Sequence, residues 1–226
     1  MPDLASIRSV VRTLTLAETD DVSNTNVDLF INQGYRWLST QFRWPWLEAT
    51  SSITVVASTA SYALPSDYRQ LWSVEDAEKR RTITRLTLEE ALNRWGGDPP
   101  TGTDARWYYI FDDNIYLLPV PSANDTARYT LYYQKQLTVM ASDTATPEFA
   151  AEFHLILADY AIARVWEHEE DFDKSRLADQ RFNDQVEAMA RYYFRREAQT
   201  PLVYGGGIHP NPAVHQNLPW LDDAGA

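Results

Sequence analysis

The chain has 226 residues, of which 44% are apolar and 23% charged, and 32 acidic residues outnumber 20 basic ones to give a net charge of −12. This length and composition predict one large globular domain, or a body with a small insertion. The charge argues against unaided binding to nucleic acid or to an anionic membrane. Because the chain has no cysteine, it cannot form disulfides, thiolate nucleophiles or thiolate metal sites.

Aromatic residues make up 13% of the chain and include 8 Trp and 13 Tyr, a high share for a plain solvated domain. Such residues are enriched at protein interfaces. No run approaches the roughly 18 apolar residues that a membrane span requires, and the absence of cysteine suits a reducing cytoplasm. We therefore expect a soluble subunit made for assembly, without a membrane segment.

Two amphipathic helices are predicted in residues 1–47. Asp3 is placed to cap the first helix, and four apolar residues recur behind it at helical spacing: Leu4, Ile7, Val11 and Leu14. In the second helix, Thr25 and Asp28 match a capping box. Its apolar stripe consists of Val27, Phe30, Ile31, Gly34 and Leu38. We expect this helix to end near Pro45, which cannot donate a backbone hydrogen bond.

Residues 48–145 predict an antiparallel β region with one short helix. Ile53–Val56 is β-branched, Ser58–Ser61 is turn-like, and Tyr62 and Leu64 resume a strand, which together indicate a hairpin.

A second hairpin is predicted from Gln70–Val74 and Thr82–Leu86, with the charged segment Glu75–Arg81 at its solvated tip. The spacing then predicts a short helix over Leu88–Trp95, capped by Thr87.

A third hairpin is predicted where Trp107–Phe111 and Ile115–Leu118 flank the tight-turn residues Asp112–Asn114. The strand Ala127–Leu137 should follow it. Its alternating pattern places three residues on one face: Tyr129, Leu131 and Tyr133.

A helical hairpin is predicted for residues 146–199. Its first helix should begin at Thr146, with Pro147 in the first helical position. The expected stripe of that helix is Phe149, Phe153, Ile156, Tyr160 and Ala163, widened by Leu155, Ile162 and Trp166. The second helix should cover about Asp173–Glu197, after the acidic link Glu167–Asp171. Its stripe is Ala178, Phe182, Val186, Met189 and Tyr193, with Glu187 paired to Arg191.

Residues 200–226 hold several Pro and Gly residues and cannot form a regular helix, so they predict an extended arm or a disordered tail. Its apolar residues, which have no helix or strand pattern to bury them, are a candidate partner interface: Leu202, Val203, Tyr204, Ile208, Leu218, Trp220 and Leu221. The predicted fold class is therefore α+β: a helical bundle with an antiparallel β insertion and an extended C-terminal arm.

No catalytic or metal-binding constellation is recognisable in the sequence. The four His residues are dispersed, and Gly205–Gly207 lacks the Lys-Ser/Thr of a phosphate loop. An acidic cluster could bind a hard cation, but it lacks the ligand order of a calcium loop, so a solvated turn is the simpler interpretation. It comprises Glu167, Glu169, Glu170, Asp171 and Asp173. We expect no enzyme activity, no cofactor and no bound metal.

Two further groups have both a structural and a functional interpretation. Arg191, Arg195 and Arg196 could touch nucleic-acid phosphates, although complementing the dipole at the end of a helix explains them more simply. Trp44 and Trp46 around Pro45 could form an exposed docking surface or a core wedge between helix and sheet.

Read in order, several short motifs resemble the head-to-tail adaptor, or connector, proteins of tailed bacteriophages. They are Arg43-Trp44-Pro45-Trp46-Leu47, Ser61-Tyr62-Ala63-Leu64-Pro65-Ser66-Asp67-Tyr68, Asp113-Asn114-Ile115-Tyr116-Leu117-Leu118-Pro119-Val120-Pro121 and the Tyr129–Tyr133 strand. The two closing helices complete the likeness, which spans roughly residues 1–197, while 204–226 match no pattern.

The resemblance implies a ring, typically of twelve copies, that lies under the portal protein, continues the DNA channel and offers a platform for tail proteins. DNA would pass through the lumen without specific binding, and no enzyme activity is implied. The subunit would assemble in the host cytoplasm and end at the head-tail junction of the virion.

Two other classes stay open on the sequence alone. One is a tail-tube or tail-completion subunit, which would form rings or stacks without the portal. The other is a virion-associated cell-wall hydrolase, which would need two carboxylates in a cleft and activity on peptidoglycan.

Overall fold

The computed structural model describes residues 1–16 and 21–198, with side chains placed as far as residue 194. Residues 1–193 form one compact unit, and the remainder from Phe194 onward forms a second. The predicted α+β class is confirmed, including the C-terminal helical hairpin. The arm predicted for 200–226 lies outside the described residues.

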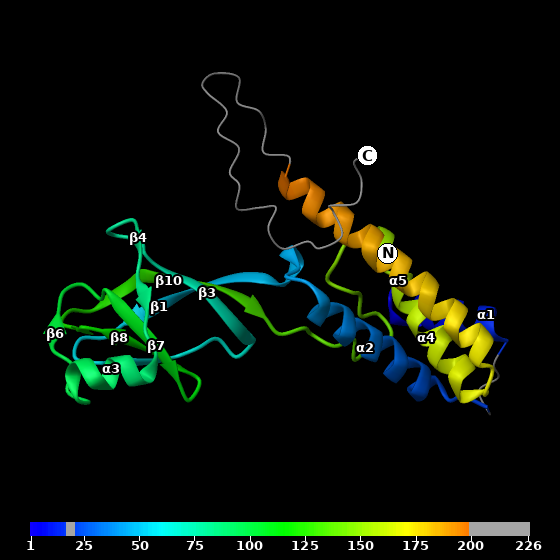
Figure 1. The fold of residues 1–226 in the computed structure, drawn as a ribbon, viewed down its shortest axis with the longest axis horizontal. Coiled ribbons are helices and arrows are strands. Elements are labelled where there is room, and N and C mark those ends of the chain that lie inside the picture. Colours follow the sequence, from blue (N-terminus) through cyan, green and yellow to red (C-terminus); the bar gives the residue numbers. More distant parts are fainter. Residues whose placement is uncertain (17–20, 199–226) are drawn as a thin grey trace, which may run out of the picture. The chain divides into compact units, whose positions relative to one another are not determined.

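The helical body consists of α1, α2, α4 and α5, with α4 in contact with both α1 and α2 (Figure 1). Its helices are α1 (Leu4–Thr15), α2 (Asn24–Gln41), α4 (Ile156–His168) and α5 (Phe172–Ala198), with 3₁₀ turns at Pro45–Leu47 and Ala151–Phe153. The strands and α3 come between α2 and α4 in the chain. The β region is therefore an insertion in the helical body.

The first helix begins as predicted, because the Asp3 carboxylate accepts a hydrogen bond from the backbone N–H of Ser6 at 2.9 Å. The predicted stripe was wrong at its end: Leu14 is 55% exposed, whereas Thr15 is buried. Thr15 continues the i, i+4 ridge of Ile7 and Val11, to which Leu14 does not belong. The stripe therefore ends on a threonine, whose hydroxyl donates to the carbonyl of Val11.

The second helix begins earlier than its predicted capping box. Ser23 is the N-cap and accepts from the N–H of Asn26 at 3.2 Å, so the predicted Thr25–Asp28 box was wrong. Asp28 instead binds the guanidinium of Arg8 through two 2.7 Å hydrogen bonds. The guanidinium of Arg8 gives Asp28 two charge-assisted bonds to a cation, whereas a capping box would give its carboxylate a single bond from a neutral backbone N–H.

Gly34 lies at a close approach of α2 to α4. A Cβ atom built on it would lie 2.7 Å from the ring of Tyr160. The remaining predicted stripe positions of α2 are buried at Val27, Ile31 and Leu38, and Tyr35 joins them. The absence of a side chain at this point is what lets the two helices pack.

The helix predicted to begin at Thr146 begins instead at Ile156, so this prediction was wrong. The N–H of Glu148 donates to the Tyr35 hydroxyl at 2.7 Å, and the N–H of Ala150 donates to the Tyr193 hydroxyl at 2.8 Å. A helix that began at Thr146 would use the N–H of Ala150 for its own ladder, but this donor binds a residue of α5, and the segment before α4 is irregular. Leu155, predicted in the stripe, is 44% exposed.

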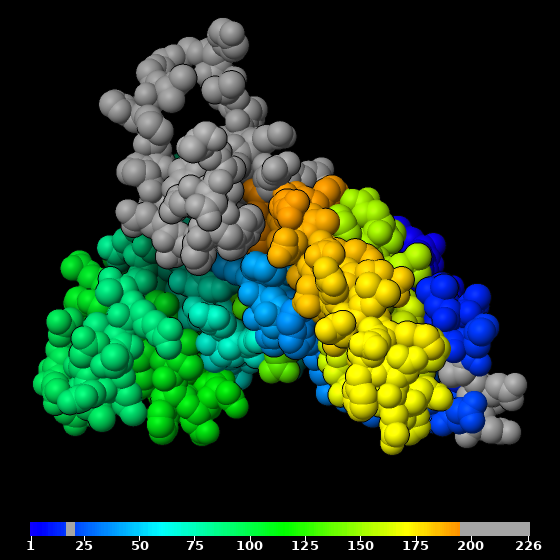
Figure 2. Space-filling view, turned by 45° about the vertical axis from the view of Figure 1, so that its right-hand side comes forward, coloured from blue at the N-terminus to red at the C-terminus, as the bar shows by residue number. Residues whose placement is uncertain are grey.

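α4 and α5 form the predicted hairpin, joined by a short acidic link in which Glu170 has a left-handed φ of 61°. Ion pairs cross between the two helices, from Arg164 to Asp179 at 2.5 Å and from Arg181 to Asp159 at 3.1 Å. Four predicted stripe residues of α5 are buried: Ala178, Phe182, Val186 and Met189. Figure 2 shows α5, in yellow to orange, along one exposed face of the helical body.

The first sheet has the strand order β1-β10-β3-β4 and is antiparallel throughout. Its strands are β1 (Glu48–Val55), β10 (Asp125–Lys135), β3 (Tyr68–Asp76) and β4 (Arg81–Thr82). The predicted inward face of β10 is confirmed, because Tyr129, Leu131 and Tyr133 are all buried. In the register between β1 and β10, Glu48 lies opposite Gln134.

The second sheet has the order β2-β8-β7-β5. Its strands are β2 (Ser61–Ala63), β8 (Asn114–Leu118), β7 (Trp107–Phe111) and β5 (Thr84–Arg85), and β5 runs parallel to β7. A separate parallel pair joins β6 (Thr101–Gly102) to β9 (Val120–Pro121). The predicted β7–β8 hairpin is confirmed, with φ of 50° at Asp112 and 54° at Asp113, as a type I′ turn requires.

The short helix α3 (Leu88–Trp95) is confirmed together with its cap. The Thr87 hydroxyl accepts from the N–H of Glu90 at 3.2 Å, and the Glu90 carboxylate accepts in return from the N–H of Thr87 at 2.7 Å. This capping box holds the pKa of Glu90 below its usual range. α3 lies against β7.

The hairpin predicted between Ile53–Val56 and Tyr62–Leu64 is wrong. β1 pairs with β10, whereas β2 pairs with β8 in the other sheet. Ile53 and Tyr62 therefore contribute to one interior from two different sheets. The alternating pattern of each strand predicts its inward face but does not define the strand's partner.

The hairpin predicted around Glu75–Arg81 forms between β3 and β4, but the segment is not all at a solvated tip, because Asp76 lies in β3, pairs with Arg81 and is fully buried. Its second strand is divided, because the buried Ile83 separates the residues that pair with β3 from those of β5, which pair with β7.

The two sheets enclose a common interior. Its buried residues come from both sheets and their connections: Ile53, Val55, Leu71, Val74, Ile83, Ala105, Tyr108, Ile115, Leu117, Tyr129, Leu131 and Tyr133. A fully buried carboxylate, Asp76 of β3, is bound by Arg128 of β10 at 3.1 and 3.0 Å. Two such bonds are the geometry that offsets the desolvation of a buried charge. Arg128 also donates to Asp104 and lowers the pKa of that carboxyl.

We predict that Gly34→Ala destabilises the protein by about 1–3 kcal/mol, the usual cost of overpacking. Alanine has the higher helix propensity by about 1 kcal/mol, so a loss would show that the contact with Tyr160 decides the outcome. The measurement is the urea unfolding midpoint. The matched control is Gln33→Ala, an exposed neighbour on α2, which should leave the midpoint nearly unchanged; a more stable Gly34→Ala would contradict the prediction.

Candidate functional site

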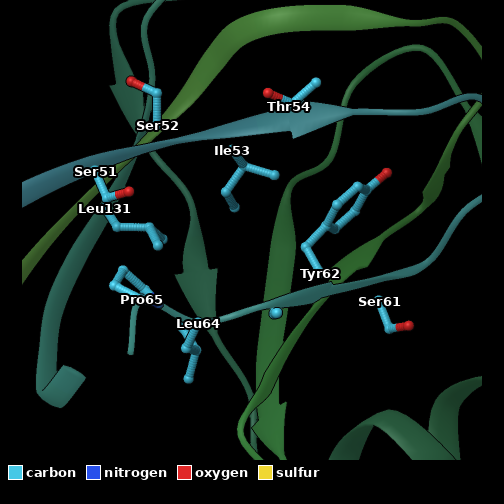
Figure 3. Close-up of a pocket in the computed structure, with 10 residues that line it drawn as sticks. Ser51, Ser52, Ile53, Thr54, Ser61, Tyr62, Leu64, Pro65 and Leu131 are labelled. Carbon is cyan, nitrogen blue, oxygen red and sulfur yellow. The ribbon is translucent and has the colours of Figure 1, made fainter. Parts of the chain in front are cut away.

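A groove of about 410 Å³ lies between β1 and β2 (Figure 3). Its wall on one side is Ser51–Thr54 of β1, and on the other Ser61–Pro65, with Leu131 of β10 behind. Ile53 and Tyr62 point into the space between the strands, whereas Ser52 and Thr54 point to the other side of β1. The groove is the open side of the interior between the two sheets.

Both walls are edge strands. β1 is the outermost strand of the first sheet and β2 the outermost strand of the second. No strand among the described residues pairs with the side of either that borders the groove. Every second residue of an edge strand directs its N–H and C=O away from the sheet, so unpaired backbone groups border the groove from both sides.

Tyr62 fixes the connection at one end of the groove. Its hydroxyl lies 2.7 Å from the carbonyl of Thr59, to which it donates, and it accepts from the N–H of Val56 at 3.3 Å. Burial raises the pKa of Tyr62 above its usual range, so the hydroxyl keeps its proton and remains a donor. This phenol therefore ties β2 to the connection that leads into it from β1.

The groove is suited to binding rather than to catalysis. Its lining, all within the described part of the chain, consists of apolar side chains and the hydroxyls of serine, threonine and tyrosine, and includes no Asp, Glu, His, Lys or Arg. A serine without a base beside it is not an activated nucleophile. Among residues 1–16 and 21–198, no group of three or more His, Asp or Glu residues is placed to hold a metal ion.

The aromatic residues around Pro45 lie in the core. Trp44 has no exposed surface, and its indole N–H donates to the carbonyl of Leu38 at 2.6 Å. Its ring lies 6.1 Å from that of Trp46, which stacks in turn on Tyr35 at 5.9 Å. Of the two interpretations of this motif, the structure supports the core. The rings of Tyr35, Phe149 and Tyr193 contact those of Trp44 and Trp46, so this core lies within the helical body rather than between helix and sheet.

The predicted site residues fall mostly outside the described part of the chain. This applies to the candidate arm interface: Leu202, Val203, Tyr204, Ile208, Leu218, Trp220 and Leu221. The side chains of Arg195 and Arg196 also lie outside it. Arg191 is described on α5, where it forms the predicted ion pair with Glu187 at 3.0 Å.

His154 is a packing residue that the sequence left unassigned. It is buried, with one ring nitrogen 2.7 Å from the carbonyl of Pro2 and the other 3.0 Å from that of Phe149. Its role is to join the start of the chain to the segment before α4. None of the described helices is both long and apolar enough to cross a membrane.

We predict that Tyr62→Phe lowers the free energy of unfolding by about 1 kcal/mol, the net value of a hydrogen bond, since the carbonyl of Thr59 loses its donor. Chemical denaturation measures the change. The control is Tyr132→Phe, whose hydroxyl donates to Glu75 at 2.8 Å on an exposed face. Water replaces that bond, so the control should change stability less; equal losses would contradict the role given to Tyr62.

Comparison with known proteins gives one family. The sequence model of the SU10 adaptor protein family matches residues 2–205, which include every described element. No curated protein matches the chain. A match of this extent covers the helical body, the β insertion and the groove together, and the family points to a structural role rather than to catalysis. The chain belongs to the SU10 adaptor protein family and is a phage adaptor protein of the virion.

Proposed function

We propose that this protein is the head-to-tail adaptor subunit of a tailed phage. Copies of it form a ring beneath the portal protein, continue the DNA channel and present a platform to tail proteins. The observation that carries the proposal is the match to the adaptor family over residues 2–205. A ring of about twelve copies and a position at the head-tail junction follow from the resemblance of the sequence motifs to connector proteins.

The acidic charge of the chain supports a position beside DNA in which the subunit does not bind the DNA tightly. At a net charge of −12, the subunit repels a phosphate backbone over a Debye length of roughly 8 Å at physiological salt. The one described member of the arginine group, Arg191, is already paired with Glu187. DNA can then pass through the ring without being held.

Attachment to the portal or to a neighbouring subunit is assigned in this proposal to residues 200–226. The compact unit ends at Tyr193, so this segment follows the folded core in the sequence. It contains apolar residues in a proline-rich context, with Trp220 as the expected anchor, since tryptophan is enriched among interface hot spots. A tail-tube subunit, in contrast, would assemble without the portal.

Truncation after Gln199 should leave helix content and melting temperature nearly unchanged, because the buried core lies within residues 1–193. It should abolish attachment, which co-sedimentation with isolated portal measures. Trp220→Ala in the full chain should weaken attachment by about 2 kcal/mol or more, with the exposed Glu89→Ala as control. Normal assembly of the truncated protein on the portal would contradict the role of the arm, and ring formation without portal would favour the tail-tube class.

The free subunit should show no appreciable affinity for duplex DNA at physiological salt, for the electrostatic reason given above. Fluorescence anisotropy with a labelled duplex measures this over a range of salt concentrations. The comparison is the triple variant Arg191→Ala/Arg195→Ala/Arg196→Ala. Tight, salt-sensitive binding that the triple variant loses would instead identify these arginines as a phosphate site.

A further inference from the structure

The groove between β1 and β2 has the features of a site for an added strand. An extended segment placed in it would meet unpaired backbone groups on the edges of two different sheets. Strand addition gains affinity from main-chain hydrogen bonds and specificity from pockets for alternate side chains. The apolar interior at Ile53, Leu64 and Leu131 provides such a pocket.

The chemistry of the lining restricts what the groove accepts. From Ala49 to Val55, β1 carries no charged side chain, and neither do the groove residues Ser61–Pro65. Charged residues make up 23% of the chain, so these two uncharged edge segments differ from its average composition. A segment that carries charge would lose hydration here without gaining an ionic partner. The groove therefore fits an uncharged segment with apolar side chains.

The chain itself contains such a segment. Between Thr200 and Leu221 it has no Asp, Glu, Lys or Arg. Within it, Leu202-Val203-Tyr204 is an apolar triplet with two residue types favoured in strands, followed by Gly205. In an extended conformation Leu202 and Tyr204 would point to one side and Val203 to the other. One side can then face the interior of the groove while the other faces solvent.

A closed ring needs a donor surface and an acceptor surface on every copy, because contacts around a ring are heterologous. We propose that the groove between β1 and β2 is the acceptor, and that it receives Leu202–Tyr204 of a second copy of this chain as an added strand. This inference rests on the proposed ring. It assigns a binding site on the described β insertion to a segment of the neighbouring subunit.

The test uses thiol cross-linking of the full-length chain, in which every thiol is introduced because the natural sequence has no cysteine. The variant Ser52→Cys/Val203→Cys carries one thiol on the outward face of β1, at the rim of the groove, and one on the residue of the segment that would also face outward. Assembled particles are treated with a short bismaleimide and analysed on denaturing gels. We expect a ladder of multimers beyond the dimer, since each copy is linked to the next. Each single-cysteine variant can give dimers at most.

The matched control is Glu89→Cys/Val203→Cys, which moves the first thiol to the exposed face of α3, against β7 and away from β2. It should give no ladder. Ser61→Cys/Val203→Cys repeats the test from the opposite wall and guards against misfolding of one variant. Three outcomes would overturn this inference without affecting the proposed ring. The first is particles that contain the subunit but give no ladder, the second is a cross-link within one chain, and the third is a cross-link to the portal. Absence of the natural chain from the particles would overturn the proposed ring as well.

Discussion

The pairing of β1 with β10 is the constraint on which the other packing depends. These strands are the first and last of the insertion, and their register places Glu48 opposite Gln134. The points where the chain leaves and rejoins the helical body are thereby held side by side. α2 and α4, far apart in sequence, can then pack as closely as Gly34 against Tyr160. The bond between Arg128 and the buried Asp76 secures the other side of β10.

The same pairing leaves the outer edge of β1 open. Monomeric proteins usually protect an edge with charges, proline or a bulge, because a free edge invites pairing with other chains. Here Ala49–Val55 has no charged residue, and only the irregularity between Ile53 and Val55 interrupts its ladder. In a monomeric protein, an unprotected edge of this kind favours unwanted pairing with other chains and aggregation. In the proposed ring, such an edge is available to pair with a neighbouring copy.

Features of the fold that have a local cause could be predicted from the sequence. The caps at Asp3 and Thr87, the Asp112-Asp113 turn and the helical period of α5 each depend on residues within a few positions of one another. The α+β class and the boundaries of most elements follow from such signals. The helix predicted to begin at Thr146 does not form there, and the N–H of Ala150, which it would have used, binds the hydroxyl of Tyr193 on α5.

The sequence by itself determined most of the helices and longer strands, the excess of acidic charge and the motifs that resemble the adaptor family, but not the start of α4 or the short strands β6 and β9. Only the tertiary structure decided which strands pair, because an alternating pattern defines the faces of a strand but not its neighbour. Ile53 and Tyr62 were expected in one hairpin, yet they lie in facing sheets. The candidate groove exists because these two strands do not pair with each other, and the absence of a pairing leaves no local pattern in the sequence.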